Sequence, residues 1–149
     1  MDWTNLYKAR VTTAQEAARV IKSGNRIFLS GNASVPQKVL AALVEYASNL
    51  INVEIVQVLT VGTAEYVSPA MQGHLRVNSM FISADVRKAV QDGRADFTPI
   101  LLSEFPLLFK QGILPLDVAL IQVSPPDEHG FCSLGVEVEP DPKKGCGFL

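Results

Sequence analysis

The sequence predicts an α/β domain, in which a parallel sheet is flanked by helices. Short runs of Val, Ile and Leu alternate with segments whose apolar residues recur at helical spacing, as in βαβ units. The runs are nearly continuous in apolar residues, which indicates helices on both faces of the sheet. With 149 residues, 48% of them hydrophobic, the chain is long enough for one domain with a core. We expect that domain over residues 1–138, followed by an irregular tail over 139–149.

The first elements follow from local signals. Thr13-Ala14-Gln15-Glu16 has the form of a capping box, so a helix is expected to begin there and to end near Gly24. The apolar run over residues 26–30 predicts the first strand. Pro36 is tolerated in the first turn of a helix, and the next helix is therefore expected to run from there to about residue 47.

The remaining elements alternate in the same way. The β-branched run over residues 53–59 predicts the second strand, and 77–82 predicts the third. Ser83 is the expected N-cap of a helix over residues 84–91, whose polar face includes Asp85. Ser103 is the expected N-cap of a short helix through Phe109. Residues 116–123 form the most continuous apolar strand, and Pro125-Pro126 ends it.

Ligands of parallel α/β sheets bind beyond the carboxyl ends of the strands, and two short turns lie in such places. The first turn, between a strand and a helix, has small residues that let a ligand approach the backbone. The simpler interpretation is a tight turn that needs Gly31 for its shape. The run does not match GxGxxG, so no dinucleotide cofactor is expected. The candidate binding residues in the two turns are Gly31, Asn32, Ala33, Ser34, Pro36 and, after the second strand, Gly62.

A third candidate loop, residues 124–135, follows the last strand and is dense in polar groups. Its candidate binding residues are Pro125, Pro126, Asp127, Glu128 and His129. The residue types of Asp127, Glu128, His129 and Cys132 could also suggest a metal site. Adjacent residues on an extended loop point in different directions, whereas zinc ligands are spaced to converge, so no metal is expected. A nucleophilic pair of Cys132 and His129 lacks a third, orienting group.

Bulk properties exclude several partners. The net charge of −2, without a basic run, argues against nucleic acid. No apolar stretch is long enough to cross a bilayer, and no signal peptide is recognisable, so we expect a cytoplasmic protein. Cys146-Gly147-Phe148-Leu149 has the form of a prenylation box, but Gly147 fits it poorly and one lipid anchors weakly. No membrane association is therefore expected.

Several long motifs resemble the acetyl-CoA hydrolase/transferase family, which includes acetate, succinate and 4-hydroxybutyrate CoA-transferases. The resemblance covers residues 3–138, and the 4-hydroxybutyrate type is preferred. The matching stretches are Thr13–Ala18, Gly31–Pro36, Gly93–Ile100, Ser103–Pro106 and Ser124–Gly135.

The resemblance implies two α/β halves that face each other across an active-site cleft. In such enzymes a glutamate carboxylate attacks the acyl-CoA thioester and forms a mixed anhydride. The CoA thiolate then returns to give a glutamyl-CoA thioester, from which a second carboxylate collects CoA. Water in its place gives hydrolysis. Coenzyme A is thus a substrate, and no cofactor is expected; the implied small-molecule partners are acyl-CoA and short carboxylates.

The family's nucleophilic glutamate and its glycine-rich CoA-binding segment belong to the carboxyl-terminal half. No stretch of this sequence matches either one, so no catalytic residue is assigned here. We expect the chain alone to be inactive and to associate with the other half, a second subunit or copies of itself. A truncated gene product and a separately encoded subunit both remain open. The alternative function is a non-catalytic interaction module.

Overall fold

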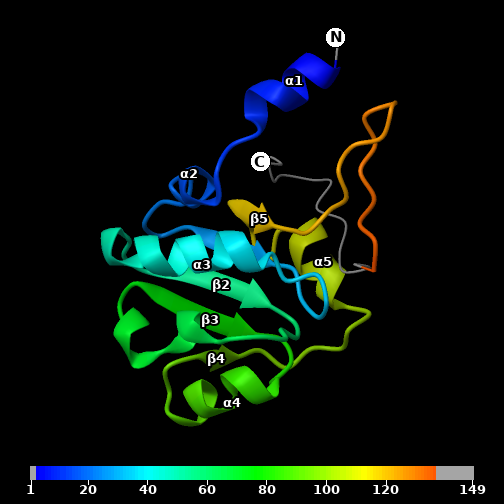
Figure 1. The fold of residues 1–149 in the computed structure, drawn as a ribbon. Coiled ribbons are helices and arrows are strands. Elements are labelled where there is room, and N and C mark those ends of the chain that lie inside the picture. The colour runs from blue at the N-terminus through cyan, green and yellow to red at the C-terminus, as the bar shows by residue number, and fades with distance from the viewer. Residues whose placement is uncertain (1–2, 137–149) are drawn as a thin grey trace.

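A computed structural model describes residues 3–136 and shows a five-stranded, entirely parallel sheet (Figure 1). This confirms the predicted fold class. The strand order is β4-β3-β2-β1-β5. The first two predicted strands begin where β1 and β2 begin, and β5 is shorter than the predicted strand over 116–123. β3 begins and ends earlier than expected, and the two-residue β4 was not predicted. The strands are β1 Arg26–Leu29, β2 Val53–Gln57, β3 Leu75–Ser79, β4 Asp96–Phe97 and β5 Val118–Leu120.

Four helices begin near their predicted places, although α2 ends at Ala18 instead of near Gly24, and the amino-terminal α1 was not predicted. The capping box is confirmed: the Thr13 hydroxyl accepts from the Glu16 N–H at 3.2 Å, and the Glu16 carboxylate accepts from the Thr13 N–H. The helices are α1 Trp3–Arg10, α2 Ala14–Ala18, α3 Gln37–Tyr46, α4 Ala84–Gln91 and α5 Phe105–Lys110, with short 3-10 turns η1 Ala47–Asn49, η2 Glu65–Val67 and η3 Pro69–Met71.

The expected cap of α5 is wrong. Ser103 lies in a turn that precedes the helix, in which the Glu104 N–H donates to the Leu101 carbonyl at 2.9 Å. Glu104 therefore takes the N-cap position, and its side chain makes no capping hydrogen bond. Pro106 in the first turn fixes where the helix begins, because proline fits only where an N–H is not needed.

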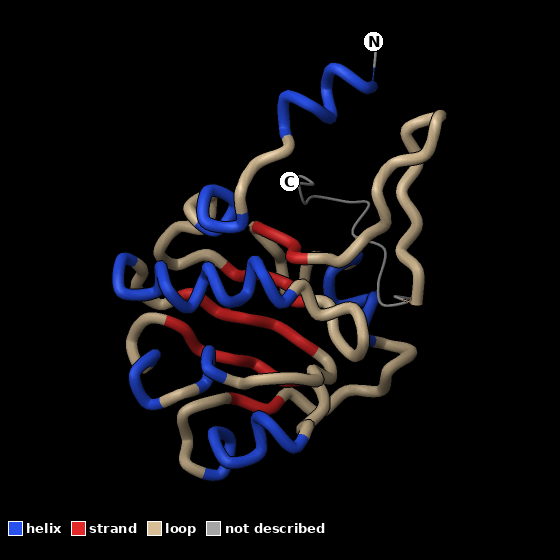
Figure 2. Tube along the Cα trace, in the orientation of Figure 1, coloured by secondary structure: helices blue, strands red, loops and turns tan. Residues whose placement is uncertain are grey.

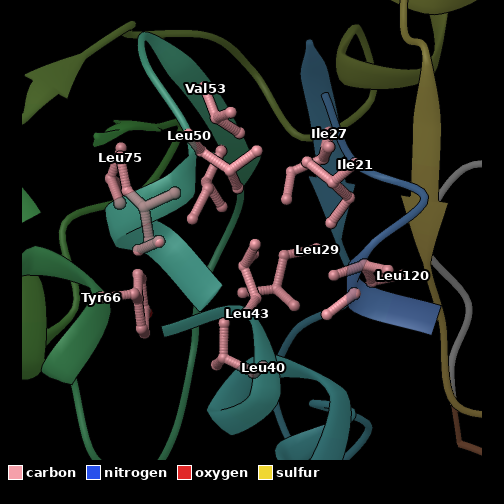
Figure 3. Packing of buried hydrophobic residues seen from close by; sticks show 14 of the residues in the cluster. Ile21, Ile27, Leu29, Leu40, Leu43, Leu50, Val53, Tyr66, Leu75 and Leu120 are labelled. Carbon is pink, nitrogen blue, oxygen red and sulfur yellow. The ribbon is translucent and has the colours of Figure 1, made fainter. Parts of the chain in front are cut away.

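The main core lies on one face of the sheet, beneath α2 and α3 (Figures 1 and 2). Alternate residues of β1, β2 and β3 point into it, since successive side chains of a strand point to opposite faces. Figure 3 shows how these side chains meet those of α3 and η2, and it labels Ile21, Ile27, Leu29, Leu40, Leu43, Leu50, Val53, Tyr66, Leu75 and Leu120.

The opposite face is divided into an apolar and a charged part. Toward the carboxyl ends of the strands, Phe28 and Val56 pack beneath α5, with the Phe28 and Phe105 rings 6.1 Å apart. Toward the other end, Arg26 pairs with Glu54 at 2.6 Å, and Arg76 pairs with Asp96. Within residues 3–136 the expectation of helices over both faces is therefore wrong for this part. The cause is the polar residues that β1, β2 and β3 place on this face, namely Arg26, Glu54, Arg76 and Asn78.

Two sequence expectations fall outside the described residues: the irregular tail over 139–149 and the Cys146 motif. Among residues 3–136, none of the helices has the length and apolar character needed to cross a membrane.

Candidate functional site

The loops that follow β1 and β2 lie side by side at the carboxyl ends of their strands (Figure 1). We call them the paired loops, residues 30–36 and 58–63. The Asn32 N–H donates to the Leu59 carbonyl at 2.7 Å, and Asn32 and Thr60 form a parallel bridge. The Gln37 side chain, at the start of α3, donates to the Val61 carbonyl at 3.2 Å. Two of the predicted candidate segments are thus brought together.

The first paired loop is a tight turn closed by its own hydrogen bonds. The Ser30 hydroxyl donates to the Ser34 carbonyl at 2.6 Å, and the Ser34 N–H donates to the Gly31 carbonyl at 2.9 Å. The left-handed residue is Asn32, with φ of 50°, so the expected conformational need for Gly31 is wrong. Asn32 and Ala33 are exposed, whereas Gly31, Ser34 and Pro36 are buried.

The structure explains why a glycine stands at position 62. Its φ of 136° disfavours any L side chain, and an added Cβ would lie 2.8 Å from Nε2 of Gln37. Gly62 therefore allows the amide of Gln37 to reach the Val61 carbonyl. The second loop leaves its backbone open to a ligand, because Val61, Gly62 and Thr63 are all exposed.

The third candidate loop leaves the sheet instead of joining the paired loops. We call residues 122–136 the projecting loop (orange, Figure 1). Its two arms are joined by the Ser124 N–H, which donates to the Ser133 carbonyl at 2.9 Å. Its tip lies against α1, where an added Cβ on Gly130 would lie 2.8 Å from Cγ of Trp3. Within this chain, Pro125 to His129 are thus separated from the paired loops.

The polar side chains of the projecting loop have local roles or none. The Asp127 carboxylate accepts from the backbone N–H groups of His129 and Phe131, each at 2.9 Å, and so shapes the tip. Glu128 and His129 lie 3.5 Å apart with both side chains largely exposed. Across residues 3–136, no three His, Cys, Asp or Glu side chains gather as metal ligands would. Cys132 is exposed with a free thiol.

A buried polar network beneath the second paired loop was missed from the sequence. The Thr60 hydroxyl donates to the Asp85 carboxylate at 2.8 Å, and it lies 2.9 Å from the Tyr66 hydroxyl and 3.2 Å from Nε2 of Gln57. Ser83 also donates to Asp85. Burial raises the pKa of Tyr66, and the charge of Asp85 adds to the rise. The placement of Asp85 on a solvated helix face is therefore wrong. The sequence contains one signal of the buried network, which is the polar Gln57 at the end of a largely apolar strand.

A pocket of about 470 Å³ lies at the opposite end of the sheet, away from the paired loops. Its wall includes His74, at the start of β3, and Arg94, after α4. His74 is half-buried, with Nδ1 2.6 Å from the Leu50 carbonyl. Arg94 is paired with Asp92 at 3.1 Å. Because His74 and Arg94 are already bonded within the fold, the paired loops remain the candidate site.

Residues 1–144 match the model of the acetyl-CoA hydrolase/transferase N-terminal domain. The chain belongs to this family.

Two similar relatives are CoA-transferases. The chain is 43% identical over 136 residues to 4-hydroxybutyrate coenzyme A transferase of Clostridium kluyveri, covering 91% of this chain and 32% of that protein. It is 42% identical over 130 residues to succinyl-CoA:acetate/propanoyl-CoA:succinate CoA transferase of Fasciola hepatica, covering 86% and 27%. The chain thus spans about a third of the length of these relatives.

Solved structures of the family share the fold. RipA from Yersinia pestis superposes with a TM-score of 0.80 at 27% identity, over 91% of this chain and 34% of that one. A 4-hydroxybutyrate CoA-transferase from Porphyromonas gingivalis gives a TM-score of 0.71 at 30% identity, over 89% and 30%. The parallel sheet and its flanking helices are therefore those of an acetyl-CoA hydrolase/transferase N-terminal domain.

Proposed function

We propose that this chain forms one wall of a CoA-transferase active site, in which the paired loops contact the acyl-CoA and the carboxylate acceptor. The observation that carries the proposal is the junction of two turns at the carboxyl ends of neighbouring parallel strands, where ligands of such sheets bind. Exposed Asn32 and Ala33, with the bare backbone at Gly62, leave room for a ligand. Gly31, Ser34 and Pro36 are buried, and the Gly31 and Ser34 carbonyls accept the hydrogen bonds that close the turn.

The chemistry favours an anionic ligand beside this wall. Helix α3 begins directly after Pro36 and has no side-chain cap. The Gln37 N–H donates to the Val35 carbonyl at 2.8 Å, and the N–H groups that follow it in the first turn can bind a negative charge. A carboxylate acceptor and the oxyanion that develops during acyl transfer both carry such a charge. The nucleophilic carboxylate is supplied by the other two thirds of the enzyme, and this chain alone is inactive. Coenzyme A acts as a substrate, and no resident cofactor is needed.

The proposed acceptor is 4-hydroxybutyrate or another short carboxylate. The name of the Clostridium kluyveri relative supports this choice, since that protein is a 4-hydroxybutyrate coenzyme A transferase. A short acceptor also suits a wall made of small side chains, because Ala33 and Gly62 add little bulk beside the exposed backbone. Hydrolysis by water is the competing reaction at the same site.

An association surface is the second candidate function. Large apolar side chains are exposed at or just after the carboxyl ends of β2, β3 and β4. Such a concentration favours association, because these groups lose contact with water only when covered. We expect the remaining two thirds of the enzyme to cover this edge, and the alternative is a second copy of this chain. In either case Pro125 to His129 of the projecting loop would contact the covering chain. The exposed residues are Val61, Phe81, Phe97, Leu101 and Leu102.

The test compares the chain alone with a fusion in which it replaces the first third of the Clostridium kluyveri relative. With acetyl-CoA and 4-hydroxybutyrate, the fusion should transfer CoA and the chain alone should not. Turnover by the chain alone would contradict the assignment of the nucleophile to the other part. A folded fusion without transfer, beside an active parent enzyme, would contradict the proposed wall. Sedimentation of the chain alone should show dimers or larger species rather than a monomer at micromolar concentrations.

A further inference from the structure

The buried network beneath the second paired loop is made from three elements that are distant along the chain. Gln57 ends β2, Tyr66 lies in η2, and Asp85 lies in the first turn of α4. All three meet at the hydroxyl of Thr60, which is 4% exposed. A polar group this deeply buried is stable only when its hydrogen bonds are made, so the network must have a definite arrangement.

Counting protons fixes that arrangement. An ionised carboxylate only accepts, so the single proton of Thr60 goes to Asp85. The Thr60 oxygen has two lone pairs left, and the Gln57 amide donates to one of them. Tyr66 must then donate its own proton to the other. Thr60 is fully satisfied, and every bond in the network points from a neutral donor toward Asp85.

Thr60 also belongs to the candidate site through its backbone. It forms the parallel bridge with Asn32, and the preceding carbonyl, that of Leu59, accepts from the Asn32 N–H. The next residue, Val61, accepts from Gln37. Thr60 thus connects the buried network to both paired loops, and the residues that follow it, Val61 to Thr63, are exposed.

We infer that Tyr66 and Asp85 are positioning residues, which act through the Thr60 hydroxyl to hold the paired loops in the geometry that receives substrate. That the paired loops receive substrate rests on the proposed function. The anchoring itself concerns only residues of this chain. Thr60 is the anchor, Asp85 its acceptor and Tyr66 its second donor. Because Tyr66 lies in η2 and Asp85 lies in α4, the second paired loop is bonded to two separate elements at once.

The arrangement agrees with the chemistry of its members. Burial raises the pKa of Tyr66, and the nearby charge of Asp85 adds to the rise, so the phenol remains a donor at neutral pH. Gln57 contributes Nε2, while its Oε1 is buried without a donor among residues 3–136. Turning this amide over would place Oε1 against Thr60, whose only proton is already committed to Asp85. The observed orientation is therefore the one the network favours.

The experiment measures hydrogen exchange of the Asn32 amide by NMR in the chain itself. Thr60→Val keeps the shape of the side chain but removes its hydroxyl, and Thr60→Ser keeps the hydroxyl. Thr60→Val removes the three hydrogen bonds made by the hydroxyl, and loss of even one buried hydrogen bond predicts about tenfold faster exchange, so the Asn32 amide should exchange at least about tenfold faster. In Thr60→Ser it should exchange at nearly the wild-type rate. Amides of β1 and β2 should be unchanged, which separates loop anchoring from general destabilisation.

Tyr66→Phe and Asp85→Asn should each raise Asn32 exchange, and they carry the test if Thr60→Val does not fold. Their matched controls are Tyr46→Phe, a half-buried tyrosine of α3, and Glu54→Gln, a half-buried carboxylate of β2 outside the network. Unchanged Asn32 exchange in folded Thr60→Val, or equal effects of the controls, would overturn the inference. Loss of Asn32 protection together with an inactive folded fusion would uphold the anchoring and overturn the proposed function.

Discussion

The paired loops and the projecting loop both follow strands of one sheet, yet the fold treats them in opposite ways. The paired loops are tied to each other and to a buried network by hydrogen bonds of 2.7–3.2 Å. The projecting loop has hydrogen bonds between its own two arms, and its tip lies against Trp3. Density of polar residues in the sequence therefore does not reveal where they lie. A segment joins a site in this chain only where the fold supplies partners for its backbone.

The largest expected contrast is in stability. Leu29 leads into the first paired loop and is fully buried, so Leu29→Ala should lower the free energy of unfolding by about 2–5 kcal/mol. Leu134 in the projecting loop is 41% exposed, and Leu134→Ala should change it by less than about 0.5 kcal/mol. Urea unfolding followed by circular dichroism measures both. Similar losses would show that the projecting loop is part of the core.

A pair of glycines sharpens the comparison. Gly62→Ala should cost roughly 2–3 kcal/mol, because alanine is strained at φ 136° and its Cβ displaces the Gln37 amide. Gly135→Ala, at φ 63° with no atom within 4 Å of its Cβ, should cost about 1 kcal/mol or less. The midpoints of urea unfolding report the difference. Equal costs would mean that Gln37 does not constrain the second paired loop.

The pH dependence tests the buried network in another way. Burial raises the pKa of Tyr66 above its ordinary value of 10.0 in the folded state. Its contribution to stability is therefore fully present below about pH 10 and is lost as the pH rises through the raised pKa. The alkaline decline in stability should be shallower in Tyr66→Phe than in wild type and should persist in Tyr46→Phe. Identical profiles for all three proteins would argue against a buried, protonated Tyr66.

The smallest effect is expected at the tip of the projecting loop. Gly130→Ala must displace the ring of Trp3, the only tryptophan of the chain, so its fluorescence emission should shift to longer wavelength. The free energy of unfolding should change by less than about 1 kcal/mol, because the contact is peripheral. Gly112→Ala is the control, with a similar φ of 69° and open space around its Cβ. An unaltered emission spectrum would mean that Trp3 does not pack on the tip.

Local patterns in the sequence were enough to place β1, β2, β5 and the capping box at Thr13, since each depends on neighbouring residues. Contacts between distant residues were not accessible in this way. Helix α1 has no buried residue, so it leaves no apolar periodicity in the sequence. β4 is two residues long and is defined by its pairing with β3.

The candidate site was predicted only in part for the same reason. Gly31 to Pro36 and Gly62 stood out because small residues after strands mark turns. Asp85 and Tyr66 did not, because their partner Thr60 lies 25 and 6 positions away. Strand order and the separation of the projecting loop from the paired loops were likewise set by tertiary structure.

The central claim, that the paired loops form a wall of the CoA-transferase site, is tested most directly by filling that wall in the fusion. Ala33 is exposed in the first paired loop, and Ala33→Phe should lower kcat/KM for acetyl-CoA and 4-hydroxybutyrate about 100-fold without unfolding the protein. Ala70→Phe, at an exposed alanine of η3 outside the paired loops, should leave kcat/KM unchanged. If Ala33→Phe were as active as Ala70→Phe, the substrate would not approach the paired loops and the account would be wrong.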